Sequence, residues 1–260
     1  MRARERGIAL VSVLWGIAIL SLIAAAMLAA TITNARINHN SWALTRANAL
    51  ADAGVTRVVL ALLDSRPEAQ PRVDGVSQSF SLDGVRLTIT VQDENGKIDI
   101  NTASPDLLAA LLASAGVRET TAGALADAIV SQRPQNAAPN IVAFHAVEDL
   151  RTIPGMTPDL LARVKPLLTV FSHNADVDQS VAPPAVLRAL PGMTEPEIDN
   201  LLAKRNEAYR QKTAAATNVG AGRAFEIVVW VSISNVRLAR RAVVEFTGDK
   251  DNPFWFVAWE

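Results

Sequence analysis

The hydrophobic pattern begins with a long apolar run and then acquires a helical period. Residues 8–35 hold no charge, so as a helix they would extend roughly 42 Å, enough to cross a hydrocarbon core of about 30 Å. Apolar residues then recur mostly at steps of three and four, at Ile37, Leu44, Ala47, Leu50, Ala51, Val55, Val58 and Leu62. The pattern predicts one helix to about Asp64, amphipathic in its second half and ended by "RPEAQP". A juxtamembrane linker helix explains the first half equally well.

The period then changes to two. Val85, Leu87, Ile89 and Val91 would share one face of a strand, and Ile98 and Ile100 follow the dipeptide Asn95-Gly96. This arrangement predicts a β-hairpin that turns at Asn-Gly. The acidic residues of "DENGKID" favour a turn with solvated carboxylates over a calcium loop, because Val91 stands where an EF-hand needs an oxygen ligand.

Residues 101 to about 215 have a helical pattern with internal repeats. Ser104 followed by Pro105 predicts a helix start. "LRTIPGMT" at 150–157 returns as "LRALPGMT" at 187–194, and "NTASPDLLAAL" at 101–111 aligns with "SVAPPAVLRAL" at 180–190. We therefore expect related helix-turn-helix units with hairpin turns at Pro154, Gly155, Pro191 and Gly192.

Strand-like alternation returns near the C-terminus, in "FEIVVWVSI", "RRAVVEFTG" and "PFWFVAWE". Because isolated hairpins are marginally stable, the strands before and after the helical region most simply pair into one antiparallel sheet. The order of elements predicts an α+β fold in which the helical region is an insertion in the sheet.

Composition narrows the function. The 260 residues include 25 Lys plus Arg, 26 Asp plus Glu, three histidines and no cysteine. The missing cysteines exclude a disulfide scaffold, a thiol nucleophile and Cys-ligated metal sites. The histidines are far apart in the chain, and no nucleophile elbow, phosphate-binding loop or zinc-protease motif is present, so we expect no catalytic activity.

The N-terminus admits three interpretations. A cleaved secretory signal has a shorter apolar core, although "AAAMLAA" offers small residues for a cut. The second interpretation is a generic single-span membrane anchor. The third rests on the junction "RERG|IALVS", which resembles the type III signal of type IV pilin-like proteins, cut by a prepilin peptidase between Gly7 and Ile8. Arg2, Arg4 and Arg6 place the N-terminus in the cytoplasm.

The repeated hairpins suggest a DNA-binding alternative. Their phrases match helix-hairpin-helix turns that bind phosphate, and "INTAS" at 100–104 resembles competence-type DNA receptors anchored in the membrane. However, residues 101–215 carry ten basic and twelve acidic residues, and carboxylates follow both turns. The charge favours an architectural role, with no nucleic acid expected.

Two pairs of aspartates have a spacing that could share a hard cation. Asp176 and Asp178 form one pair, and Asp249 and Asp251 the other. Paired surface aspartates more often lie in solvated turns, so these four are weak candidates for calcium ligands.

Taken together, the motifs resemble the type II secretion system protein K family, the large minor pseudopilins of the general secretion pathway. The resemblance rests on the leader ending at Gly7, "DENGKIDINTASPDLLAALL", "AVEDLRTIPGMTPDLLARVKPLLTVFS", "APPAVLRALPGMT" and the C-terminal "FVAWE". Ser12 also fits, since most pilin-like proteins have a Glu at this fifth mature position and protein K typically lacks it.

The resemblance implies a pilin-like fold with a helix-hairpin-helix or SAM-like domain inserted in its sheet. The expected segments are a leader at 1–7, an N-terminal helix at 8–64 with its span at Ile8–Ala30, β segments at 65–100 and 223–260, and the insert at 101–222. It also implies a place in the inner membrane with a periplasmic C-terminal domain. The implied role is at the pseudopilus tip with minor pseudopilins I and J, supporting export of folded proteins.

The family also suggests calcium bound through acidic loops of the α-domain. Here the chain departs from the pattern, because "SQRPQNAAPN" at 131–140 holds no carboxylate.

Overall fold

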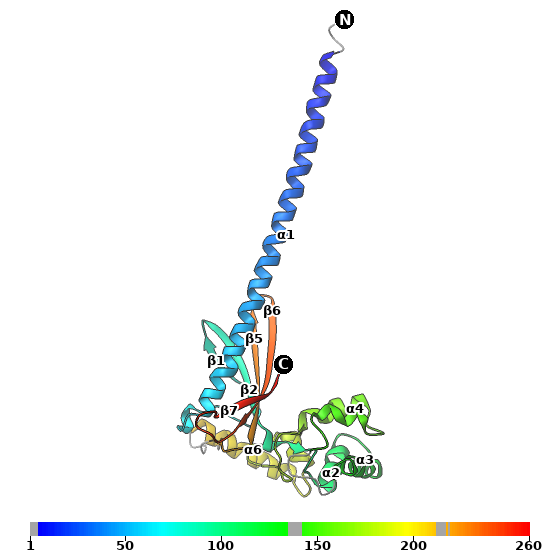
Figure 1. Ribbon diagram of the computed structural model, residues 1–260, viewed down its shortest axis with the longest axis vertical. Helices are drawn as coiled ribbons and strands as arrows, with labels where there is room; N and C mark the ends of the chain where they lie inside the picture. The colour runs from blue at the N-terminus through cyan, green and yellow to red at the C-terminus, as the bar shows by residue number, and fades with distance from the viewer. Residues whose placement is uncertain (1–4, 135–141, 212–216, 218) are drawn as a thin grey trace.

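The computed structural model describes residues 5–134, 142–211, 217 and 219–260. One helix, α1 (Glu5–Leu62), projects from the rest of the molecule as a stalk (Figure 1). No proline interrupts it, because the first proline of the chain is Pro67, where the short 3-10 helix η1 (Pro67–Ala69) begins. The single long helix expected from the sequence is confirmed.

The lower half of α1 buries one face. Its buried residues recur at helical steps and are Ala43, Ala47, Leu50, Ala51, Val55, Val58, Val59 and Leu62. Leu44 departs from the prediction, because its side chain is 48% exposed. Ala43, one residue earlier, occupies the buried position, and the step of about 100° between neighbours turns Leu44 to the side.

The buried face of α1 packs on a five-stranded antiparallel sheet. The strands are β1 (Gln78–Leu82), β2 (Val85–Asp93), β5 (Arg223–Ile233), β6 (Val236–Phe246) and β7 (Phe254–Trp259), in the order β1-β2-β5-β6-β7. Leu87, Ile89 and Val91 face α1 and are buried, and Val91 pairs with Ile227. The strands before and after the helical region therefore pair, as the sequence pattern predicts.

The hairpin predicted at Asn95-Gly96 is wrong. After β2 the chain forms the 3-10 turn η2 (Glu94–Gly96), and β3 (Ile98–Asp99) pairs in parallel with β4 (Leu168–Thr169). Asp93 accepts a hydrogen bond from the amide of Asn95 at 3.0 Å, which directs the chain away from β2. A side chain at Gly96 would lie 2.7 Å from the carbonyl of Val181, so this glycine serves a close approach of two segments.

The hairpin of β2 is instead made with β1. Its turn is Asp83-Gly84, and both residues have positive φ angles, 49° and 73°, as the two-residue turn of type I′ requires. The carboxylates of "DENGKID" also depart from the prediction, because Asp93 and Glu94 are buried rather than solvated.

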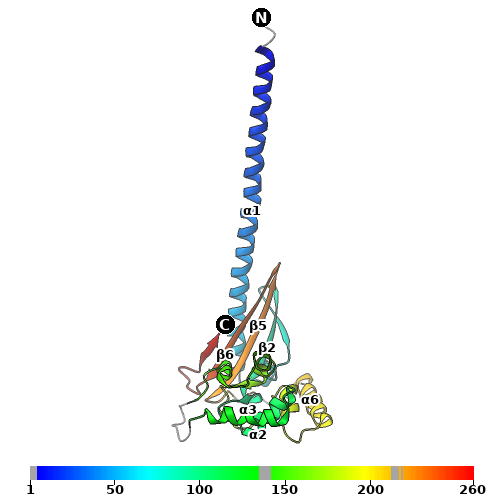
Figure 2. The ribbon, with the colours of Figure 1, turned by 90° about the vertical axis from the view of Figure 1, so that its right-hand side faces the viewer.

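The helical block occupies residues between β2 and β5 and lies at the end of the sheet far from the N-terminus (Figure 2). It contains α2 (Pro105–Ser114), α3 (Glu119–Ser131), η3 (Val147–Thr152), α4 (Pro158–Val164), η4 (Lys165–Leu167), α5 (Pro184–Ala189) and α6 (Glu195–Arg210). The hydroxyl of Ser104 accepts a hydrogen bond from the amide of Leu107 at 3.2 Å, so the predicted cap is confirmed.

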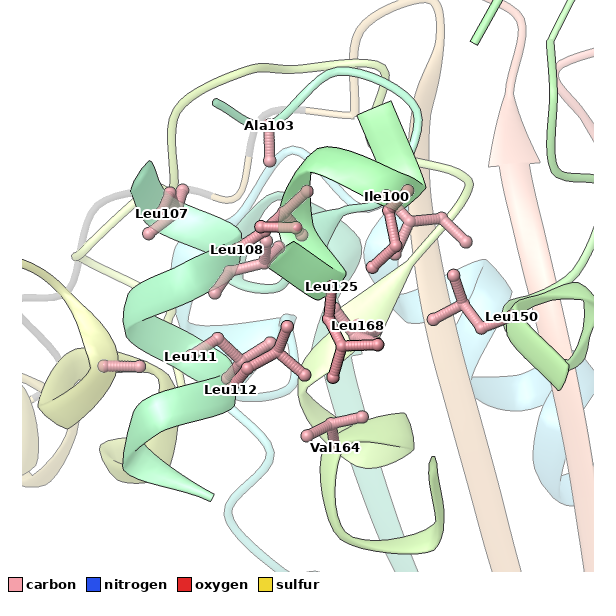
Figure 3. Close-up of a cluster of buried hydrophobic side chains, with 14 of the residues drawn as sticks. Ile100, Ala103, Leu107, Leu108, Leu111, Leu112, Leu125, Leu150, Val164 and Leu168 are labelled. Atoms are coloured by element: carbon pink, nitrogen blue, oxygen red, sulfur yellow. The ribbon is translucent and has the colours of Figure 1, made fainter. Parts of the chain in front are cut away.

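The helical block has a hydrophobic core of its own. Leu108 and Leu111 of α2 meet Leu125 of α3, Leu150 of η3 and Leu168 of β4 in its centre (Figure 3). A second core lies between α1 and the sheet. The molecule is thus an α+β protein with an apolar N-terminal helix and an antiparallel sheet, consistent with a pilin-like fold.

Candidate membrane span and assembly surfaces

The stretch Val11–Leu28 of α1 exposes apolar side chains. The window Val11–Leu28 has a mean hydropathy of 2.4 and no part of it is buried, and Trp15, Leu20 and Leu22 are among its most exposed residues. Apolar surface on this scale is unfavourable in water. Among the described residues, α1 is a helix that is both long enough and apolar enough to cross a membrane. This is compatible with a single-pass anchor.

The residues of the predicted processing site lie at the start of α1. Gly7 and Ile8 fall within its first two turns, and Ser12 follows one turn later. Residues 1–4 of the predicted leader lie outside the described residues. The helix is continuous through the predicted junction and onward into the apolar span.

Close contacts and ion pairs hold the stalk to the sheet. A side chain at Gly54 would lie 2.9 Å from Cγ1 of Val229, so α1 and β5 approach more closely than larger residues allow. Arg240 on β6 forms an ion pair with Asp52 on α1 at 2.8 Å. The lower part of α1 is therefore packed and paired along the sheet.

A buried group of charges joins the sheet to the helical block. Lys97 is 6% exposed, and its Nζ lies 2.9 Å from Oε1 of Glu94 and 2.6 Å from Oε2 of Glu226 on β5. Arg241 on β6 forms a second ion pair with Glu226. We call this group, Glu94, Lys97, Glu226 and Arg241, the charged junction. It could not be predicted from the sequence because Lys97 and Glu226 are 129 residues apart. Its one local sign was a glutamate, Glu226, within an apolar strand.

The charges of the junction shift one another's pKa. Burial raises the pKa of Glu94. Burial acts in the same direction on Glu226, but the charge of Lys97 and the hydrogen bonds from Lys97 and Arg241 outweigh it and lower the pKa of Glu226 to about 2. The two carboxylates raise the pKa of Lys97 in spite of its burial. The ammonium group is therefore kept charged between them.

A further ion pair, between Arg223 and Asp93, lies beside this group of charges. Arg223, at the start of β5, donates from Nε to Oδ2 of the buried Asp93 at 2.7 Å. Burial raises the pKa of Asp93, and the Arg223 guanidinium opposes the shift. Arg223 also lies 3.6 Å from Asp178 in the helical block. Both junctions thus bring together the end of β2, the start of β5 and the helical block.

The repeated hairpin turns are exposed, and the residues that flank the first of them pack in the core of the helical block. Gly155 and Gly192 have positive φ angles of 92° and 82°, and the flanking Ile153 and Met156 are buried. At α6, Oε2 of Glu197 accepts a hydrogen bond from the amide of Thr194 at 2.9 Å. A carboxylate of the chain therefore already accepts a hydrogen bond from an amide at the start of this helix.

One aspartate of each pair accepts hydrogen bonds from donors of the chain itself. Oδ1 of Asp178 accepts hydrogen bonds from the amide and the hydroxyl of Ser180, and Oδ1 of Asp249 accepts one from the amide of Asp251. Asp176 is exposed. Within residues 5–134, 142–211, 217 and 219–260, no three His, Asp or Glu side chains are grouped so as to hold a metal. Most of "SQRPQNAAPN" lies outside the described residues.

Comparisons with known proteins gave a similarity to solved structures. No protein-family model matches the chain, and no curated protein matches its sequence. The chain is similar to a chain of the GspK-GspI-GspJ complex from the type 2 secretion system of enterotoxigenic Escherichia coli. The two share 14% sequence identity with a TM-score of 0.45, over 88% of this chain and 98% of that chain.

Proposed function

We propose that this protein is a minor pseudopilin of a type II secretion system, anchored in the inner membrane with its C-terminal part in the periplasm. The observation that carries the proposal is the continuity of α1. One helix has an exposed apolar upper half, and its lower half packs on an antiparallel sheet. A helix of this kind can lie in lipid and later pack beside other helices in a filament without any change in the globular part.

The position within the filament follows from Ser12 and from the helical block. In pilin-like proteins a glutamate at this position is thought to neutralise the N-terminal amine of a neighbouring subunit, and Ser12 lacks that carboxylate. The helical block adds bulk beside the far end of the sheet. Both features favour a terminal place, where one side of the subunit has no neighbour, and there the protein would initiate the filament.

The proposed role involves assembly and no chemical reaction. Its partners would be the minor pseudopilins I and J, with a prepilin peptidase acting on the leader and inner-membrane lipid around the span. The domains would follow the segments 1–7, 8–64, 65–100, 101–222 and 223–260. The repeated units would serve as architecture within the segment 101–222, the largest of the five.

Co-purification tests the assignment to the tip. The full chain, tagged at its C-terminus, would be expressed with the full-length I and J pseudopilins and purified in mild detergent. We expect all three proteins to elute together in a single complex. A single-span membrane protein of similar size with the same tag is the control. Recovery of an I and J complex that excludes this chain would contradict the proposal.

A further inference from the structure

The strand β7 forms an open edge of the five-stranded sheet. The order β1-β2-β5-β6-β7 places it at one side, and among the described residues no strand pairs with it on its outer side (Figure 2, red strand). The amide of Thr247 donates to the carbonyl of Pro253, so Pro253 faces β6. By alternation, the N–H and C=O groups of Phe254 and Phe256 point away from β6. β7 therefore offers backbone groups to a further strand.

The side chains of this edge are mostly apolar and exposed. Four of the six residues of β7 are large, apolar and exposed, namely Trp255, Phe256, Val257 and Trp259. Elsewhere after α1 in the described chain, the large apolar side chains of comparable exposure are Val76 and Trp230. Natural sheets protect an edge strand with charges, prolines or short length, and β7 itself holds no charged residue. Its composition is that of a strand covered by a partner.

The opposite edge of the sheet is protected. In β1 the exposed side chains are those of Ser79 and Ser81. The one aromatic residue of β1, Phe80, is half-buried, and the guanidinium of Arg57 lies 4.6 Å from its ring centre. The two edges therefore differ in kind, because β1 presents hydroxyl groups and β7 presents aromatic rings.

A row of aromatic rings connects β7 with the core beneath α1. The buried Phe246 belongs to that core, and its ring centre lies 6.3 Å from that of Phe254. Phe254 contacts Phe256 at 5.6 Å, and Phe256 contacts Trp259 at 4.8 Å, both edge to face. An added strand would extend this apolar layer, because its side chains on the same face would be buried against Phe256 and Trp259.

Acidic residues around β7 indicate the charge of its partner. Trp255 pairs across the sheet with Glu245 on β6, and Asp249 and Asp251 lie in the turn before β7. None of these three carboxylates forms an ion pair among the described residues, and Lys250 is the one basic residue of the turn. A Lys or Arg on an added strand would lie over the Trp255 ring and near Glu245.

The same acids disfavour a second copy of this chain as the occupant. Two copies of β7 in antiparallel pairing, related by a twofold axis, would bring Glu260 of one copy near Asp251 of the other. Like charges placed opposite each other in a sheet are destabilising. The edge is therefore suited to a different chain, one that carries basic residues.

We propose that β7 is the docking site of an extended segment of a partner subunit, which adds a sixth strand to the sheet. The segment has apolar side chains on the face of Phe256 and Trp259 and a basic side chain on the face of Trp255. The inference rests on the proposed function, because it assigns this edge to a pseudopilin partner. Backbone hydrogen bonds would hold the segment, and the side chains on its two faces would select the partner.

Hydrogen exchange of the full-length complex tests the proposal. The chain is co-purified in mild detergent with the full-length I and J pseudopilins, and the exchange of single amides is compared with that in the chain alone. We expect exchange at Phe254 and Phe256 to slow about tenfold or more in the complex, because these N–H groups gain hydrogen bonds. The amides of Ser79 and Ser81, which point away from β2 at the other edge, should keep their rates.

Matched variants separate the backbone from the charge. Phe256→Pro removes an outward N–H of β7, and Ser79→Pro removes an outward N–H of β1. Phe256→Pro should weaken binding to the I and J pair about tenfold, Phe256→Leu less, and Ser79→Pro not at all. Glu245→Lys should also weaken binding about tenfold, whereas Glu119→Lys makes the same change of charge at an exposed site of α3 and should leave binding unchanged.

Two results would overturn the proposal. One is a complex of the three proteins in which Phe254 and Phe256 exchange as fast as in the chain alone. The other is exchange at these amides that slows as the concentration of the chain alone rises, which would assign the edge to a second copy. A complex of the I and J pseudopilins that excludes this chain would instead contradict the proposed function itself.

Discussion

Glu94 and Glu226 lie on either side of Lys97, and their pKa values move in opposite directions. Burial raises the pKa of Glu94, whereas Lys97 and Arg241 together lower the pKa of Glu226 to about 2 against its burial. The difference follows from the number of cationic partners. Glu226 lies between two cations, and Glu94 shares one cation in a fully buried position.

This arrangement predicts an acid-sensitive contribution to stability. The folded state favours ionised Glu226, so its contribution is fully present above the ordinary pKa of 4.5 and is lost as the pH falls toward 2. Glu226→Gln removes that contribution, which is at most about 3 kcal/mol. We expect a lower free energy of unfolding at pH 7 and a smaller further loss between pH 5 and pH 3, measured by urea unfolding of the detergent-solubilised chain.

The exposed Glu119 at the start of α3 offers a matched control. Glu119→Gln should keep the pH dependence of the unaltered chain. Parallel stability curves for Glu226→Gln and the unaltered chain would contradict an ionised, stabilising Glu226.

Single residues of the junction could not be found from the sequence. The charges in "DENGKID" have the composition of a solvated turn, and only the distant Glu226 and Arg223 make their burial tolerable. By contrast, Ser104 was predictable as a cap because its partner, the amide of Leu107, is only three residues away. Local hydrogen bonds can be read from spacing, whereas ion pairs across the fold cannot.

At the scale of elements, α1 and the sheet meet at an unusually close contact. Gly54 faces β5, where Cβ of any larger residue would lie 2.9 Å from Cγ1 of Val229. Valine is stiff about its first torsion, so it cannot easily give way. The helical period of α1 was visible in the sequence, but the depth of its contact depends on the side chains of β5.

Gly54→Val should therefore separate α1 from β5. We expect a loss of about 1–3 kcal/mol in the free energy of unfolding, from overpacking. Gly123→Val is the matched control, because Gly123 also lies in a helix, α3, but has open space around its Cβ position. A loss at Gly54 no larger than that at Gly123 would argue against the close contact, and urea unfolding of both variants measures the difference.

Turn chemistry explains which element predictions succeeded. Strand alternation located β2, β5 and β6, and the marginal stability of isolated hairpins predicted that β2 pairs with β5. The prediction of a hairpin at Asn95-Gly96 was wrong. An Asn-Gly pair favours a tight hairpin, but here the buried Asp93 and the nearby carbonyl of Val181 turn the chain away from β2. Asp83-Gly84 carries an equivalent signal and does form the hairpin turn.

At the scale of the whole molecule, α1 joins two environments. Its upper half is suited to lipid, and its lower half belongs to the core between helix and sheet, while the helical block keeps a separate core. The sequence predicted this division because each part has its own hydrophobic period. It could not predict which surfaces remain exposed, such as Trp230 on the sheet, because alternation marks two faces without saying which one is covered.

The division of α1 leads to a prediction about processing of the whole chain. If the leader "MRARERG" is removed and the apolar helix stays with the protein, co-expression with a prepilin peptidase should give a chain that begins at Ile8. A glycine before the cut leaves room for the peptidase, so Gly7→Val should retain the leader, whereas Gly16→Val, within the span, should be processed normally. Intact mass spectrometry distinguishes the products. An unprocessed Met1 in the unaltered chain would contradict a pilin-like leader, and a cut near Ala30 would mean that the span is lost and that the globular part is released from the membrane.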